Sequence, residues 1–166
     1  METVVADTTT GVSLRAITRD NLDAILRLNV DPDQKTFVAS NVYSLAEAWT
    51  EPSFQPFAIY HADEPVGFTM YGLEESTARW WVVRLMVDAG HQAHGFGRAA
   101  MQLLLPLMVE RHGMQRIVTS YEPGNDVAAA LYRKLGFQDT GELDEGEYLM
   151  VLDLPATLTG KDDLST

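Results

Sequence analysis

The sequence predicts an α/β (α+β) domain with a mixed, partly parallel central sheet of about six to seven strands, flanked by about four helices. Three observations predict this fold. Short segments with strand-like patterns recur along the chain, amphipathic segments separate them, and the second half follows a strand-helix-strand-helix order. A chain of 166 residues can bury the core of one such domain.

The first two elements lie between residues 12 and 28. Residues 12–18 alternate apolar and polar side chains, which predicts a strand. Thr18 or Asp20 can then cap a helix whose apolar residues lie on one face. The Asp-Pro-Asp sequence at 31–33 ends this helix.

A second helix and a hairpin follow. Ser44 is expected to cap a helix through residues 45–49. Residues 57–60 and 66–71 are short strands, and the turn chemistry of residues 63–65 predicts that they pair antiparallel.

Residues 80–87 form the longest strand candidate. Their continuous apolar character predicts a central strand that is buried on both faces. The apolar pattern of residues 97–112 predicts a helix that Gly113 stops and Pro106 kinks.

The last third of the chain repeats the strand-helix order. Residues 116–121 read as a strand, and Asn125 or Asp126 caps a helix that Gly136 ends. Two final strands are expected at residues 137–139 and 148–154. The predicted boundaries are a disordered arm over residues 1–11, one domain over 12–155 and a disordered tail over 156–166.

Composition excludes several classes of function. The chain has 24 acidic and 12 basic residues, and its net charge of −12 repels nucleic acid and favours a cationic partner, although solubility alone also accounts for it. The absence of cysteine excludes disulfides and thiolate chemistry and favours the cytoplasm. No apolar run approaches the roughly 20 residues that span a bilayer, so no membrane partner is expected.

A glycine turn follows the long strand. Gly95 and Gly97 allow a phosphate to approach the backbone, and the first amides of the next helix point toward it. Two glycines before a helix also serve plain turn geometry, so this string alone leaves both interpretations open.

Three features in this order are more specific. The strand ends in Leu-Met-Val at 85–87, a Gln-x-x-Gly-x-Gly turn follows at 92–97, and an Asn-x-x-Ala-x-x-Leu-Tyr-x-x-Leu-Gly-Phe string covers 125–137. The set resembles the GCN5-related N-acetyltransferase (GNAT) superfamily. Strings such as Trp-Trp-x-x-Arg-Leu-Met at 80–86 resemble its bacterial spermine/spermidine (polyamine) acetyltransferases.

This resemblance implies acetyl-CoA as the acetyl donor and a splay of the sheet after the family's fourth strand. It also implies that Tyr132 is the general acid for the departing thiolate, although a core aromatic is the plain alternative. No metal is implied. The implied cofactor-binding residues are Leu85, Met86, Val87, Gln92, Ala93, His94, Gly95, Phe96, Gly97, Arg98, Asn125 and Tyr132.

Two departures from the family pattern concern the turn and the base. Ala93 and His94 stand where many relatives have glycine and a basic residue. The strand carries Trp81 and Val83 where several relatives have a glutamate as general base, so no carboxylate is available there. Deprotonation of the acceptor then passes through water or through an acid elsewhere. Glu122 and Glu147 are the candidate acids, and both are also ordinary surface acids.

The expected acceptor is a small cationic amine, since a polyamine needs spaced carboxylates between aromatic or apolar walls. The expected substrate-binding residues are Asp33, Glu47, Tyr71, Glu74, Glu75 and Trp80. An enzyme that inactivates an aminoglycoside or a streptothricin-like antibiotic, a non-catalytic acyl-CoA-binding module and a peptide N-terminal acetyltransferase are the alternatives. By analogy with related enzymes, a homodimer is expected.

Overall fold

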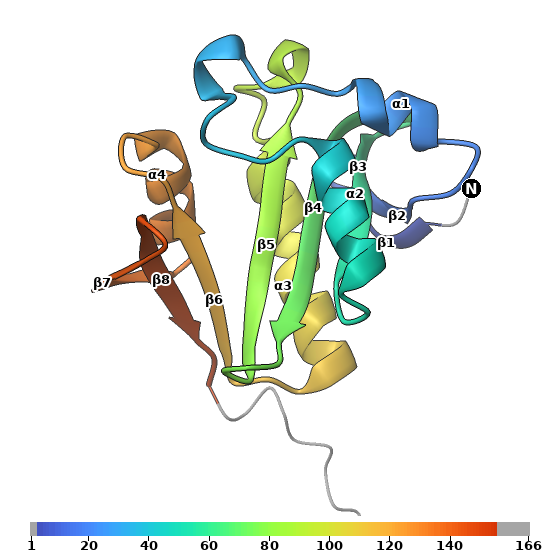
Figure 1. Cartoon of the computed structure of the whole chain (residues 1–166). Coiled ribbons are helices and arrows are strands. Elements are labelled where there is room, and N and C mark those ends of the chain that lie inside the picture. The colour runs from blue at the N-terminus through green and yellow to red at the C-terminus, as the bar shows by residue number, and fades with distance from the viewer. Residues whose placement is uncertain (1–2, 156–166) are drawn as a thin grey trace, which may run out of the picture.

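The computed structural model describes residues 3–155, which build one sheet of 8 strands in the order β1-β2-β3-β4-β5-β6-β8-β7 (Figure 1). The strands are β1 (Thr3–Asp7), β2 (Val12–Ala16), β3 (Gln55–His61), β4 (Glu64–Glu74), β5 (Arg79–Val87), β6 (Arg116–Tyr121), β7 (Gln138–Asp144) and β8 (Glu147–Asp153). The helices are α1 (Leu22–Arg27), α2 (Asn41–Thr50), α3 (Phe96–His112) and α4 (Asp126–Lys134), with short 3₁₀ turns η1 (Pro32–Gln34) and η2 (Ala89–His91).

The mixed α/β fold is confirmed, with one strand more than expected. Every neighbouring pair of strands is antiparallel except β5 and β6, which are parallel. The additional strand is β1, which pairs with β2 in the segment expected to be a disordered arm. The expected disordered tail at 156–166 lies outside the described residues.

Alternate residues of the central strands pack on opposite faces of the sheet. Phe57 and Ile59 of β3 belong to the core against α3, whereas Ala58 and Tyr60 belong to a second core with Ile25 of α1. Figure 1 shows α3 behind the sheet and α1 and α2 in front of it. The site described below opens on the α2 side.

Two of the helix boundaries differ in detail from the prediction. Asn21 is the N-cap residue of α1, instead of Thr18 or Asp20. Helix α2 begins one turn earlier than expected, because the side chain of Ser40 accepts from the Tyr43 amide, and Ser44 lies inside the helix.

Asn125 caps α4 by accepting from the Ala128 amide at 3.3 Å, as predicted. Gly113 ends α3 in the left-handed region, also as predicted. Strand β7 is longer than the predicted residues 137–139 and runs to Asp144.

Strands β5 and β6 touch only at one end. Their parallel pairing is restricted to Trp80 with Ile117 and Trp81 with Val118, after which the two strands diverge (Figure 1). The prediction that β5 is buried on both faces is therefore wrong, since only Val82 and Met86 are buried within it. The divergence is the splay that the family resemblance implied.

Candidate active site

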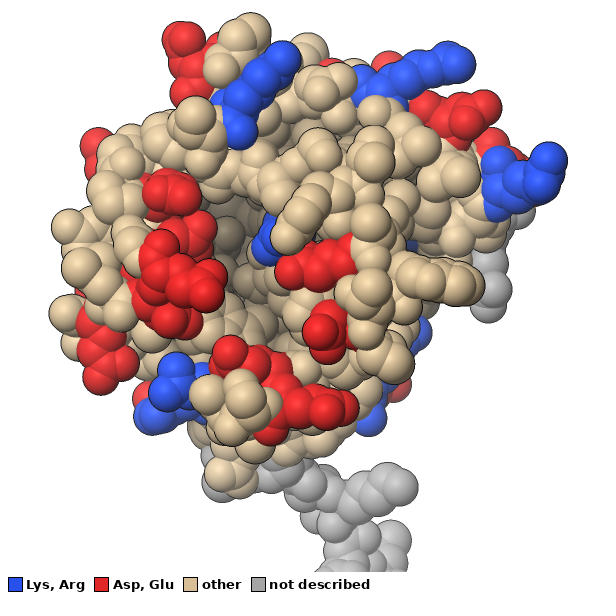
Figure 2. All heavy atoms as spheres, viewed as in Figure 1, with Lys and Arg blue, Asp and Glu red and all other residues tan. Residues whose placement is uncertain are grey.

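A cleft of about 2190 Å³ opens where β5 and β6 separate. Ligand pockets for small molecules usually have about 300–1,000 Å³, so this cleft can hold a cofactor arm and an acceptor together. Residues from the η1–α2 segment, from β5, from β6 and from α4 line it. Figure 2 shows the hollow with Asp and Glu side chains on several sides.

The glycine turn forms one end of the cleft. Gly95 is the N-cap residue of α3 with φ of 78°, and a Cβ at this position would have nothing within 4 Å. Helix geometry leaves the first amides of α3 without partners inside the helix, so they can receive an anion. Ala93 also has a positive φ, 64°, which glycine adopts without strain.

Most predicted cofactor-binding residues line this cleft. They are Leu85, Met86, Val87, Gln92, Ala93, Gly95, Phe96, Gly97, Arg98, Asn125 and Tyr132. His94 does not line it. Its ring stacks on Phe96 at 5.5 Å between centroids, and its Nδ1 lies 3.2 Å from the carbonyl oxygen of His91.

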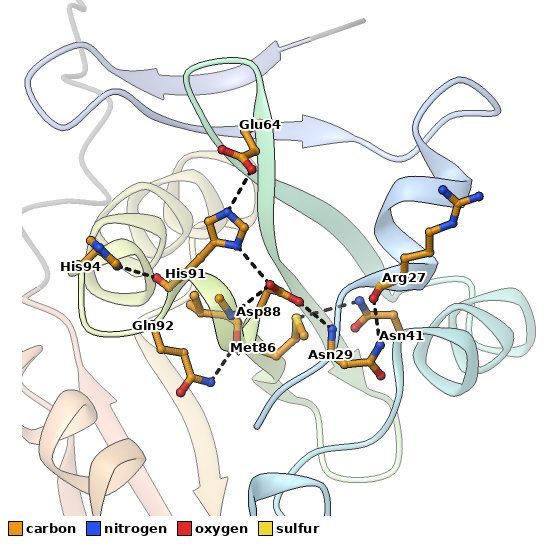
Figure 3. A network of polar contacts seen from close by, with 11 residues as sticks. Arg27, Asn29, Asn41, Glu64, Met86, Asp88, His91, Gln92 and His94 are labelled. Atoms are coloured by element: carbon orange, nitrogen blue, oxygen red, sulfur yellow. Dashed lines mark hydrogen bonds and ion pairs between the residues drawn. The ribbon is translucent and has the colours of Figure 1, made fainter. Parts of the chain in front are cut away.

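A network of polar contacts around Asp88 and His91 supports the glycine turn (Figure 3). The Asp88 carboxylate accepts from the backbone amides of Asn29 at 2.9 Å and Gly90 at 3.2 Å, and it lies 3.1 Å from Nδ1 of His91. Nε2 of the same ring lies 3.1 Å from the Glu64 carboxylate. Burial opposes both charges, but these hydrogen bonds lower the pKa of Asp88 and raise the pKa of His91.

Gln92 connects the turn to the other wall of the cleft. Its side-chain amide donates to Oε1 of Gln34 at 2.7 Å and to the carbonyl of Val87 at 3.1 Å. The residue that the motif marked as a cofactor contact therefore also ties η1 to the end of β5.

Tyr132 lies at the meeting point of α4 and the splayed strands. Its side chain is buried, and its ring packs 5.7 Å from that of Phe137. Burial raises the pKa of the phenol, with a smaller contribution from the charge of Glu147, while a hydrogen bond with Thr119 lowers it. The phenol is therefore protonated at neutral pH.

The two candidate bases both line the cleft. Glu147 begins β8 and accepts a short hydrogen bond from the Ser120 hydroxyl. Glu122 follows β6 and makes no side-chain hydrogen bond to the described residues.

The acceptor half contains three of the predicted substrate residues, namely Glu47, Glu74 and Glu75. Glu47 pairs with Arg84, whose Nη2 lies 2.8 Å from its Oε2. Glu74 accepts from Nε1 of Trp81 at 3.3 Å.

The other three predicted substrate residues do not line the cleft. Tyr71 is fully buried against α3, where its hydroxyl lies 3.0 Å from Nε2 of His112. Trp80 stacks on the same imidazole at 4.1 Å. Asp33 is exposed on η1. Trp81 rather than Trp80 lines the cleft, so the prediction of Trp80 as an aromatic wall of the acceptor site is wrong.

Sequence reasoning missed Arg84 as a residue of the cleft. The available signal was a single charged residue inside an otherwise apolar strand, which a buried strand tolerates only with a partner. Among residues 3–155, no group of three or more His, Cys, Asp or Glu residues could hold a metal ion, and no helix is long and apolar enough to cross a membrane.

Comparisons with known proteins agree with this architecture. Residues 22–137 match the model of the Acetyltransferase (GNAT) family. The spermine/spermidine N(1)-acetyltransferase of Bacillus subtilis (strain 168) is 33% identical over 150 residues, which are 86% of this chain and 99% of that protein. The mycothiol acetyltransferase of Clavibacter sepedonicus is 30% identical over 135 residues, which are 78% of this chain and 43% of that protein.

Solved structures show the same fold. An acetyltransferase from Thermus thermophilus superposes with a TM-score of 0.67 at 21% identity, covering 86% of this chain and 97% of that one. RimJ of Mycobacterium smegmatis, solved in complex with CoA-disulfide, gives 0.66 at 19% identity, covering 86% and 81%. The family match, the identity to the Bacillus enzyme and the splayed sheet lead to one conclusion: the chain belongs to the GNAT family of acetyltransferases and is an acyltransferase.

Proposed function

We propose that the protein transfers the acetyl group of acetyl-CoA to a primary amine of a spermidine- or spermine-like polyamine, by direct attack of the amine on the thioester. One observation carries the proposal. A single cleft joins the glycine turn and the buried phenol of Tyr132 to walls rich in carboxylates.

The cofactor half fits a pyrophosphate. Open space lies over Gly95, free amides begin α3, and Arg98 adds a positive charge at the cleft. Bound there, acetyl-CoA supplies the thioester. The diverging end of β5 leaves a strand edge near Leu85 and Val87 along which an extended chain could lie.

The acceptor half fits a cation. Carboxylates outnumber cationic side chains in the lining of the cleft, and they come from four separate segments. The carboxylates are Glu47, Glu51, Glu74, Glu75, Glu122, Asp144, Glu145 and Glu147, and the cationic side chains are Lys35, Arg84, Arg98 and Lys134. Acids on separate segments suit a flexible amine with several ammonium groups. The Bacillus relative, named as a spermine/spermidine acetyltransferase, supports this choice of acceptor.

Protons move at the sulfur and at the nitrogen. Tyr132 can donate its proton to the departing thiolate, because burial keeps the phenol neutral. An acceptor that arrives as an ammonium must lose one proton before it attacks and a second as the amide forms, and Glu122 or Glu147 can take these protons through water. Ser120 orients Glu147 by its hydrogen bond, so Glu147 is the better placed of the two.

A thiol-release assay with a panel of amines tests the proposal. The panel contains spermidine, spermine, a monoamine, an aminoglycoside, a streptothricin-like compound and a peptide N-terminus. We expect the highest kcat/KM on the linear polyamines. A higher kcat/KM on an antibiotic or a peptide would show that the acceptor is not a polyamine. No turnover on any amine would favour a non-catalytic acyl-CoA-binding module.

The location and assembly of the enzyme stay predictions. We propose a cytoplasmic homodimer. Light scattering of the purified full chain measures the assembly directly, and a monomeric mass would contradict it.

A further inference from the structure

We infer that Arg84 is the positioning residue of the acceptor pocket: it holds the Glu47 carboxylate and keeps that carboxylate from trapping the acceptor amine in its protonated form. This inference rests on the proposed function. It assigns a role to Arg84, a charged residue of β5 that the acetyl-transfer chemistry above does not use.

A bulge in β5 directs Arg84 to the acceptor side. The register with β4 shifts, because Met70 pairs with Arg84 whereas Tyr71 pairs with Val82, so Val83 is an extra residue. Before the bulge, the even positions Trp80 and Val82 pack in the core against α3.

Without the extra residue, Arg84 would continue that series into the core. The bulge reverses the phase, so that Leu85 packs against the α3 core and Arg84 reaches α2 on the opposite face. Bulges commonly redirect a side chain in this way near active sites.

Two contacts then fix the guanidinium. Nη1 donates to the carbonyl of Val83 at 2.8 Å, and Nη2 donates to Oε2 of Glu47 at 2.8 Å. The carbonyl of Arg84 itself accepts from the Thr69 hydroxyl at 2.8 Å. Arg84 therefore links the bulge, through the Val83 carbonyl, to the Glu47 carboxylate of α2.

The pair leaves one carboxylate oxygen for a ligand. The side chains of Arg84 and Glu47 are 19% and 27% exposed, so water screens the pair only partly. Oε1 of Glu47 makes no hydrogen bond to the described residues. It can accept from an amine of the acceptor.

Neutralisation by Arg84 matters because only the neutral amine attacks. An unpaired carboxylate beside an ammonium group stabilises the charged form and raises the pKa of the amine. A carboxylate already shared with a guanidinium accepts a hydrogen bond but raises that pKa less. This is useful in a cleft whose central strand offers no base of its own.

Other charged groups of the cleft bear on the same amine. They are Glu51 at the C-cap of α2, Glu74 at the end of β4, Glu75 after it, Glu122 after β6, Asp144 at the end of β7, Glu145 of the β7–β8 turn, Glu147 of β8, His91 of η2, Lys35, Arg98 and Lys134. These groups stay unchanged in the variants below, so a difference between variants reports the Arg84–Glu47 pair alone.

The test compares three variants in the full chain. Calorimetry with CoA present gives the Kd of spermidine, and the thiol-release assay gives kcat as a function of pH. Glu47→Gln should weaken spermidine about ten- to a hundredfold, the value of one charge-assisted hydrogen bond. Arg84→Gln should instead tighten spermidine about three- to tenfold while lowering kcat, and it should move the alkaline rise of kcat to higher pH.

Arg84→Lys keeps the charge, so its pH profile should follow that of the wild type. Asp153→Asn is the control, since it breaks the exposed pair of Arg116 and Asp153 outside the cleft. A loss of packing alone would lower binding in both Arg84 variants and leave the pH profile in place.

Each outcome decides a separate claim. Turnover of an amine other than a polyamine overturns the proposed acceptor, and the variants are then compared on that amine. Unchanged binding by Glu47→Gln, or weaker binding by Arg84→Gln with an unshifted pH profile, overturns the role of Arg84 and leaves the acetyltransferase function intact. If the wild type binds no amine, both the proposed acceptor and the role of Arg84 are overturned.

Discussion

Replacing Ala93 with glycine is expected to stabilise the protein. Ala93 is exposed and has φ of 64°, so its Cβ gains little from packing while it strains the backbone. An L-residue in this region costs about 1–2 kcal/mol. Glycine also has more conformational freedom in the unfolded chain, and this offsets about 0.4–1 kcal/mol of the gain.

The difference leaves a gain of roughly 0.5–1 kcal/mol, the centre of the range that these two terms allow. For a chain of this size, each kcal/mol shifts Tm by about 2–4 °C, so the expected rise is about 1–4 °C. Thermal unfolding followed by circular dichroism, together with urea unfolding, measures it.

The chain offers a matched control for this change. Ala78 is also exposed, has φ of 54° and lies outside the lining of the cleft. Ala78→Gly should raise Tm by a similar amount. Neither variant should change the KM of acetyl-CoA by more than about twofold, since the backbone keeps its shape. A fall in Tm for Ala93→Gly alone would show that the Cβ stabilises the turn, which would refute the argument from strain.

The remaining predictions concern three residues of the site. Tyr132→Phe should lower kcat about a hundredfold and leave the KM of acetyl-CoA unchanged, because only the transferable proton is lost; unaltered turnover would remove the phenol from the mechanism. Gly95→Ala, at φ of 78° with open space for its Cβ, should lose about 1–2 kcal/mol of stability and bind CoA more weakly in a direct titration, whereas Gly113→Ala should lose stability only. For His91→Gln, the Tm deficit should be larger near about pH 5.5 than near about pH 8, and an equal deficit at both would contradict a stabilising imidazolium.

The sign of the His91 effect follows from its contacts. Burial works against the imidazolium, but the carboxylates of Asp88 and Glu64 raise its pKa in the folded state above the ordinary value of 6.5. The stabilisation is therefore complete below 6.5 and is lost as the pH rises through the folded value. His91 is 25% exposed, so solvent screening keeps the effect small.

The glycine turn and the helices around it could be predicted because their signals are local. Gly95, Gly113 and Asn125 mark helix ends by their own backbone or side-chain chemistry. Strand β1 could not be predicted in the same way. Its five residues carry little pattern and become a strand by pairing with β2.

The faces of β5 show a different limit. Alternation along a strand predicts the face of each residue only while the register is unbroken. The extra residue at Val83 depends on how β5 meets β4, and no pattern within the strand marks it. The side on which Arg84 lies therefore could not be predicted from the strand pattern. Trp80 was predicted as a wall of the acceptor site from its aromatic character, which does not indicate the face on which a side chain lies.

The sparse pairing of β5 with β6 has a consequence for unfolding. Within the sheet ladder, two residue pairs connect a five-stranded block, β1 to β5, with a three-stranded block, β6 to β8, while Ile117 and Met150 share the α3 core with side chains of β2 to β5. A ligand chain that hydrogen-bonds along β5 and contacts α4 would join the two blocks. We therefore expect the unliganded protein to exchange the amide hydrogens of β6–β8 through partial opening, and CoA to make unfolding of the two blocks more nearly concerted.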